Sequence, residues 1–214
     1  MGLAVCVGVL ADLIENDPES SEMLAQEMAT ANLLLAEAGQ TQHDEPKALP
    51  EFRSRASLDS FPYSFIHYLR FAYAHVTQDP SWRAKPLAEG SDPASDPTVE
   101  DVSSMFESHL LCHSDCEGFY FPIDFDEVIF SDEDRELSGG MLGSSFQLRS
   151  ELIQVAPALG ISLTSSGELE DTEADRINNV GESDEGLYRE LTSWIALYEA
   201  CRISIKHRTA IVFG

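Results

Sequence analysis

Residues 58–76 read LDSFPYSFIHYLRFAYAHV. Ser60 can cap a helix, and Pro62 suits its first turn because no backbone N–H is needed there. Apolar side chains then occupy nearly every side of the helix, and a helix that is apolar all round is buried. The stretch therefore predicts the central helix of the fold. His67 and Arg70 lie on it and need partners if buried, so we treat both as candidate binding residues.

Other segments show the periodicity of helices or strands on either side of this one. Helical spacing of apolar residues indicates helices over about 20–38, 96–113, 144–158 and 184–206, and Asp96 is expected to cap the second of them. Strands are expected at residues 2–10, at 210–213 and within 118–130, where apolar residues alternate. We predict an α+β fold that is mostly helical. It has about five helices around a buried central helix, a small sheet from the termini and the 118–130 segment, and a single domain over residues 1–214.

Charge is the unusual feature of the composition. The chain carries 38 Asp and Glu against 13 Lys and Arg, a formal net charge of −25. Acids outnumber bases in each of the first four blocks of fifty residues, so the charge belongs to the fold rather than to a tail. Such a surface repels phosphate backbones and anionic lipids. We therefore expect no nucleic acid and no membrane as partners. A basic protein is the expected partner, unless the acids serve solubility alone.

The N-terminal segment and the cysteines indicate a cytoplasmic protein. The apolar start is short, has no basic residues before it and runs directly into acids, which is unlike a secretory signal or a membrane span. The four cysteines suggest no exported disulfide framework.

The most concentrated chemistry lies in HLLCHSDCEG, residues 109–118. If the helix continues through this segment, His109, Cys112, His113 and Cys116 project from one face, and imidazole and thiolate are ligands for Zn²⁺. Four ligands on one helix line only one side of an ion, so a histidine pair completed by a carboxylate is easier to build. The candidate metal ligands are therefore His109, His113, Cys116 and Asp115. The alternative is a helix end with core-facing histidines and a small buried cysteine.

Basic residues are scarce, so their positions matter. Arg53 and Arg55 flank a serine in EFRSRAS, and they either pair with the abundant acids or form an isolated anion site. We include both among the candidate binding residues.

The stretch MFESHLLCHSDCEGFYFPIDF, residues 105–125, followed by GGMLGSS, resembles a motif of uncharacterised bacterial cytosolic proteins. The resemblance implies a bacterial origin and covers about a fifth of the chain. It brings no activity, substrate or catalytic residue with it.

Two functions of different class follow from these patterns. The first is an acidic protein-binding protein, of the inhibitor or immunity type, that masks a basic partner. The second is a metal-binding protein, with hydrolase activity as one form, that uses the 109–118 cluster and Zn²⁺. No standard catalytic motif is present, which favours a non-enzymatic role, and the sequence leaves the oligomeric state open.

Overall fold

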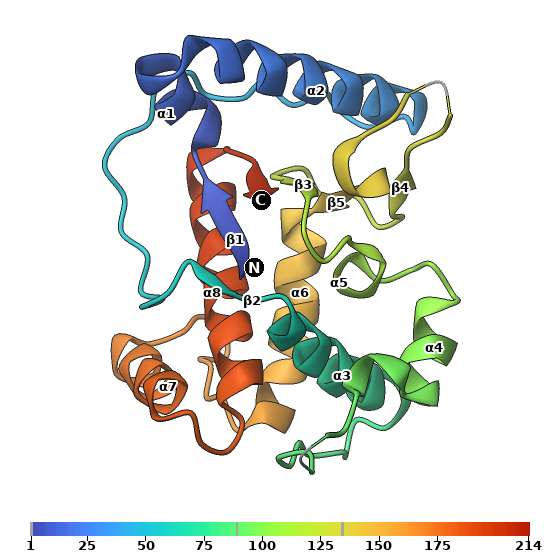
Figure 1. Ribbon diagram of the computed structural model, residues 1–214, viewed down its shortest axis with the longest axis vertical. Coiled ribbons are helices and arrows are strands. Elements are labelled where there is room, and N and C mark those ends of the chain that lie inside the picture. Colours follow the sequence, from blue (N-terminus) through green and yellow to red (C-terminus); the bar gives the residue numbers. More distant parts are fainter. Residues whose placement is uncertain (1, 89, 134) are drawn as a thin grey trace.

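The computed structural model describes residues 2–88, 90–133 and 135–214 (Figure 1). These residues form eight α-helices and one six-stranded mixed sheet, which confirms the predicted α+β class. The helices are α1 (Val9–Asn16), α2 (Pro18–Glu37), α3 (Ser64–Gln78), α4 (Pro97–Ser103), α5 (His109–Cys112), α6 (Ser145–Val155), α7 (Asp171–Ser183) and α8 (Tyr188–His207). The strands are β1 (Gly2–Val7), β2 (Ser60–Pro62), β3 (Gly118–Phe121), β4 (Ile129–Phe130), β5 (Met141–Ser144) and β6 (Ile211–Phe213).

The sheet has the strand order β2-β1-β6-β3-β5-β4. The two terminal strands pair with each other, antiparallel, with Val5 opposite Phe213, and the 118–130 segment belongs to the same sheet, as the sequence predicted. Its strand β3 pairs antiparallel with β6 inside the sheet. The pair β3 and β5 is parallel. Two strands were not predicted. Residues 60–62, expected as the first turn of a helix, instead pair with β1 at the edge of the sheet, where a proline is tolerated. Strand β5 lies in a segment that gave no strand signal.

Helices cover both faces of the sheet and form one hydrophobic core on each face. The side chains of strand β3 alternate between these two cores. Its Phe119 and Phe121 pack with Met28, Leu34 and other residues of α2 on one face. Tyr120, between them, faces the larger core formed by α3, α6 and α8. Successive side chains of a strand point to opposite faces, so this short strand joins the two cores. Figure 1 shows α2 lying across one end of the molecule, away from the bundle of α3, α6 and α8.

The central helix is α8 rather than α3, which corrects the prediction from residues 58–76. Fourteen of the twenty residues of α8 are buried, whereas α3 buries seven of fifteen. Helix α8 contacts α3, α6, α7 and β1. The sequence of α8 has the pattern of a helix with one apolar and one polar face, because Glu190 and Glu199 interrupt its apolar residues. Both glutamates are nevertheless buried, so charge on the sequence did not mean exposure in the fold.

The helix expected over residues 96–113 is broken in two, and this accounts for part of the difference from about five helices. Asp96 caps α4 as predicted, accepting a 2.8 Å hydrogen bond from the backbone N–H of Thr98. Helix α4 then ends at Ser103, and Phe106 takes a left-handed backbone conformation with φ of 56°. No α-helix continues through such a residue. The chain becomes helical again only for the single turn of α5. Helices α1 and α7 account for the rest of the difference between the eight helices observed and the five predicted.

Candidate functional site

The predicted metal ligands do not share one helix face, because α5 ends at Cys112. His109 is buried with both ring nitrogens in use. Its Nδ1 accepts a 3.0 Å hydrogen bond from the N–H of Ser144, and its Nε2 lies 3.1 Å from the carbonyl oxygen of Asp126. Burial lowers the pKa of His109, so the ring is neutral and joins three segments of the fold. The expectation that His109, His113 and Cys116 project together was wrong.

The other predicted ligands point to different places. His113 stacks on Tyr120 with ring centroids 4.2 Å apart, and burial lowers its pKa to about 3. Cys116 is exposed, and Asp115 turns towards Arg70 and His67. Across residues 2–88, 90–133 and 135–214, no group of three or more His, Cys, Asp or Glu is placed to hold a metal ion. The arrangement gives the zinc hypothesis no support.

Arg70 and His67, the polar residues of α3, both serve the segment after α5. The guanidinium of Arg70 donates to the carbonyl oxygens of Leu110, at 2.9 Å, and of His113, and it pairs with Asp115. His67 Nε2 lies 3.3 Å from the same carboxylate. These contacts satisfy the carbonyls left open where the short helix ends. The structure therefore gives both residues a role in holding residues 110–115.

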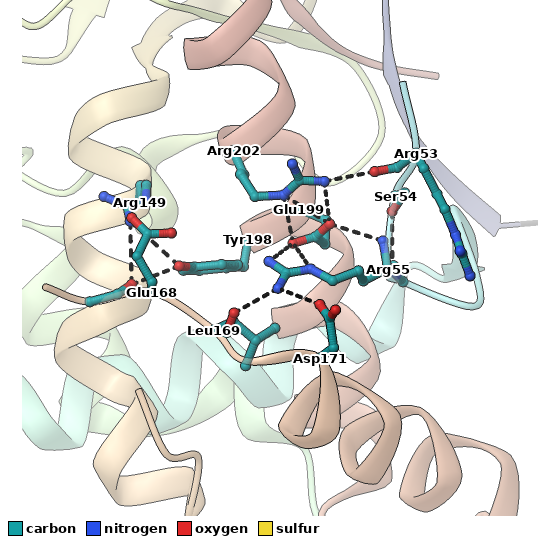
Figure 2. Close-up of polar contacts among 12 residues, drawn as sticks. Arg53, Ser54, Arg55, Arg149, Glu168, Leu169, Asp171, Tyr198, Glu199 and Arg202 are labelled. Atoms are coloured by element: carbon teal, nitrogen blue, oxygen red, sulfur yellow. Dashed lines mark hydrogen bonds and ion pairs between the residues drawn. The ribbon is translucent and has the colours of Figure 1, made fainter. Parts of the chain in front are cut away.

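Arg55 lies beside α8 with its guanidinium on the buried carboxylate of Glu199, whereas Arg53 takes part through its backbone carbonyl and its side chain points away (Figure 2). Nη2 of Arg55 and Nη2 of Arg202 approach its two oxygens at 2.6 and 2.7 Å. Arg55 also reaches Asp171 at 3.3 Å, and Arg202 donates to the carbonyl of Arg53 at 2.7 Å. We call Glu199, Arg55, Arg202 and Asp171 the Glu199 cluster. It borders an open cavity of about 740 Å³ that Arg53, Arg55 and Arg202 line, and carboxylates engage Arg55 and Arg202.

A much larger fraction of the arginines than of the acids forms ion pairs within the fold. Six of the ten arginines form ion pairs with seven carboxylates in the described part of the chain. Of the 36 acids that the structure describes, 28 are exposed. The negative charge of the sequence is thus displayed on the surface, while much of the positive charge is neutralised within the molecule.

One concentration of exposed acids follows α1 and α2 and continues into the segment around β4. We call it the anionic ridge. Its members are Asp12, Glu15, Asp17, Glu19, Glu22, Glu37, Asp126, Glu127, Asp132, Glu133 and Glu136. Figure 1 shows α2 and the segment around β4 side by side at one end of the molecule. Two contacts join them, because Arg135 pairs with Glu37 and the N–H of Ser138 donates to Glu27 at 2.8 Å.

Helix α2 presents the ridge because its two sides have different composition. Met28, Ala31, Leu34 and Leu35 are buried against the sheet. Glu19, Glu22 and Glu37 project from the opposite side, near the two ends of the helix. Asp17 caps the helix by accepting a hydrogen bond from the N–H of Ser20, and bonds from Ser20 lower the pKa of Asp17. Acids near a helix N-terminus are also favoured by the helix dipole.

A model of one protein family matches residues 1–213, and its description reads "Putative DNA-mimic protein". The chain belongs to this DNA-mimic family. No curated protein and no solved structure matches the sequence. No helix within the described residues of this DNA-mimic family member is long and apolar enough to cross a membrane.

The family membership corrects the prediction about partners. We expected no nucleic acid among the partners, because the acidic surface repels phosphates. The family description instead names its members as mimics of DNA, that is, as proteins that resemble DNA and not as proteins that bind it. The same negative charge that makes an acidic surface repel DNA also makes that surface resemble DNA.

The residues of the ridge were not singled out from the sequence of this DNA-mimic family member. A signal was available, since Asp12, Glu15, Glu19 and Glu22 recur at intervals of three and four residues. Within one helix that spacing places acids along one side. In the structure Asp12 and Glu15 lie on α1 and Glu19 and Glu22 on α2, so the spacing holds within each helix. It was masked because acids are frequent throughout the chain, and a charged helix face is normally only a solvated one.

Proposed function

We propose that this protein is a DNA mimic that binds the DNA-binding face of a protein and keeps that protein from DNA. It is an inhibitor that masks its partner, and the anionic ridge is the surface that makes contact. The observation that carries the proposal is the presence of this ridge on a chain of the DNA-mimic family.

The dimensions of the ridge suit this role. Helix α2 has twenty residues and is therefore about 30 Å long. Duplex DNA rises 3.4 Å per base pair, so this length corresponds to about nine base pairs. Carboxylates gather at both ends of α2, with the acids of α1 beyond one end and those around β4 beyond the other. A protein that contacts phosphates over about one turn of DNA would meet negative charge over a comparable distance.

The pairing of basic residues within the molecule also supports the proposal. Lys and Arg on the ridge would compete with those of a partner. Arg135 is the arginine among the ridge segments, and it is already paired with Glu37 and Asp132. Most ridge carboxylates are exposed and free to attract cations from outside, which accelerates association at low salt. Binding through many such contacts weakens steeply as salt rises.

The test is competition with DNA. The immobilised protein is incubated with nuclease-treated cell lysate at low salt, and bound proteins are eluted with a duplex of about 20 base pairs. We expect the duplex to release DNA-binding proteins. Each is identified by mass spectrometry, purified, and tested for displacement of labelled duplex by the mimic in fluorescence anisotropy.

Two variants with the same change in charge locate the surface. Glu15→Gln, Glu19→Gln and Glu22→Gln together neutralise three ridge acids, and Glu182→Gln, Asp184→Asn and Glu185→Gln neutralise three exposed acids near the end of α7. We expect the ridge variant to weaken displacement about tenfold or more, and the α7 variant to stay close to wild type. Equal losses would show that only the net charge matters. If duplex DNA elutes no protein, the DNA-mimic proposal is wrong.

A further inference from the structure

Three large apolar side chains stand exposed next to the anionic ridge. Met105 is 61% exposed, Phe106 63% and Phe130 45%. The two phenylalanine rings meet edge to face with centroids 5.8 Å apart. We call these three residues, the methionine Met105 and the two aromatic residues Phe106 and Phe130, the aromatic patch. Phe106 and Phe130 come from two segments, the connection between α4 and α5 and the edge strand β4, so the fold brings these two rings together, and Met105 precedes Phe106 in the chain. Apolar surface clustered in this way marks a place of contact with another molecule.

The backbone conformation at Phe106 is one in which a bulky side chain lowers the stability of the fold. Its φ of 56° lies in the left-handed region, which glycine adopts freely and asparagine tolerates, whereas a bulky residue is strained there. An exposed ring recovers little of this cost by burial. Stability alone would favour Gly or Asn at this position. The presence of Phe is accounted for if the side chain acts outside the folded molecule.

The charges around the patch select the kind of molecule that can cover it. Exposed Glu107 follows Phe106 directly, and Phe130 lies between the ridge acids Glu127 and Asp132. A second copy of this chain would bring another formal charge of −25 and the same acids against them. Like charges brought together at an interface oppose association. The surroundings therefore favour an occupant with cationic groups around an apolar centre.

DNA-binding faces of proteins have this composition. Their Lys and Arg contact phosphates, and apolar side chains among them touch thymine methyl groups or wedge between base steps. We propose that the aromatic patch docks against the apolar part of the partner's DNA-binding face, with Phe106 and Phe130 as anchors and the ridge engaging the surrounding cations. This inference rests on the proposed function. Buried aromatic residues at the centre of an interface carry much of the binding energy.

The test separates side chain from backbone. Phe106→Asn removes the ring and relieves the left-handed strain, so we expect an unchanged or higher thermal midpoint together with at least tenfold weaker binding. The probes are the purified proteins that duplex DNA eluted in the preceding experiment, and poly-L-lysine as a polycation without a folded face. Binding to poly-L-lysine should equal that of wild type. Leu58→Asn is the matched control, because Leu58 is 48% exposed and precedes β2 at the opposite edge of the sheet.

The outcomes distinguish the two proposals. If wild type binds no protein that DNA displaces, the proposed function fails and takes this inference with it. If wild type binds such proteins and Phe106→Asn binds them equally well, the function stands and the aromatic patch has no part in it. Sedimentation of the free protein gives the third arm. A wild-type dimer that becomes monomeric in Phe106→Asn would show that a second copy occupies the patch, and would overturn the inference.

Discussion

The Glu199 cluster and the anionic ridge place the same chemical group in opposite surroundings. The carboxylate of Glu199 is fully buried, and two arginines and a backbone N–H satisfy its oxygens. Burial by itself would raise the pKa of Glu199, but hydrogen bonds from Arg202 and Arg55 outweigh that effect and lower it. On the ridge, carboxylates such as Glu15 and Glu22 stand in water. Acids in the cluster hold the fold together, whereas most acids on the ridge face solvent, where the proposed partner would meet them.

The largest effect is expected from neutralising the cluster. Glu199→Gln leaves the half-buried guanidinium groups of Arg55 and Arg202 without their counter-charge. Breaking a buried ion pair by removing one member costs about 3–5 kcal/mol. We expect a loss towards the lower end of that range in the free energy of unfolding, measured with urea. Glu168→Gln, which removes the exposed partner of Arg149, is the control and should cost below about 1 kcal/mol. Equal losses would remove the distinction between paired and displayed acids.

A second interior carboxylate should give a clear pH dependence. Glu151 accepts hydrogen bonds from the N–H groups of His109 and Leu110, and burial nevertheless raises its pKa to about 7. Between pH 4.5 and 7 Glu151 keeps a proton in the folded protein that it has released in the unfolded chain, so the contribution of Glu151 to stability falls as pH rises. The contribution amounts to about 3 kcal/mol by pH 8. Unfolding free energies of wild type and Glu151→Gln are measured between pH 4.5 and 8. The free energy of wild type minus that of the variant should fall by about 3 kcal/mol over this range, because the opposite contribution of His113, whose pKa is lowered, is common to both proteins and cancels. Parallel slopes would contradict this assignment.

Asp17 lies on the ridge and yet has a local structural role. Its side chain caps α2 through the N–H and hydroxyl of Ser20, the latter at 2.6 Å. Asp17→Ala should lower the free energy of unfolding by about 1 kcal/mol. Asp17→Asn retains an oxygen acceptor for the cap and should lose only part of this. A loss as large in the Asn variant would mean that the charge, not the cap, is what stabilises the helix.

The smallest effect on stability is expected on the rest of the ridge. The variant that combines Glu15→Gln, Glu19→Gln and Glu22→Gln should change the free energy of unfolding by within about 0.5 kcal/mol, because substitutions of exposed residues outside such contacts are nearly neutral. Urea unfolding at low and high salt measures it. Strong destabilisation would show that the ridge serves the fold. The same variant is expected to lose most of its competition with DNA, so stability and binding should separate here.

The sequence predicted the parts of the fold that depend on local pattern. Apolar ends gave the β1 and β6 pair, and the cap at Asp96 is as expected. It did not predict that the acids of α8 would be buried. The burial of Glu199 depends on Arg55, which lies 144 residues away from it along the chain. Pairings at such distances leave no trace in the periodicity of either segment.

The candidate site shows the same limit. Total charge indicated an anionic surface and a protein partner, but the ridge requires α2 and the segment around β4 to meet, and the aromatic patch requires Phe106 to meet Phe130. The His and Cys residues of 109–118 suggested metal chemistry because their helical spacing was assumed. Helix α5 stops at Cys112, and the segment instead packs around Arg70 and Tyr120.

The position of β6 has a consequence for the speed of folding. This strand lies between β1 and β3 and joins β2 and β1 to the other three strands. Val5 pairs with Phe213, and Phe119 pairs with Val212, so the middle of the sheet forms between segments far apart in the chain. Closing such long loops costs entropy before any contact is gained, and proteins dominated by distant pairings fold slowly. The helices can form early, but the sheet that supports α2 is completed late, and the acids of α2 reach their final positions only then.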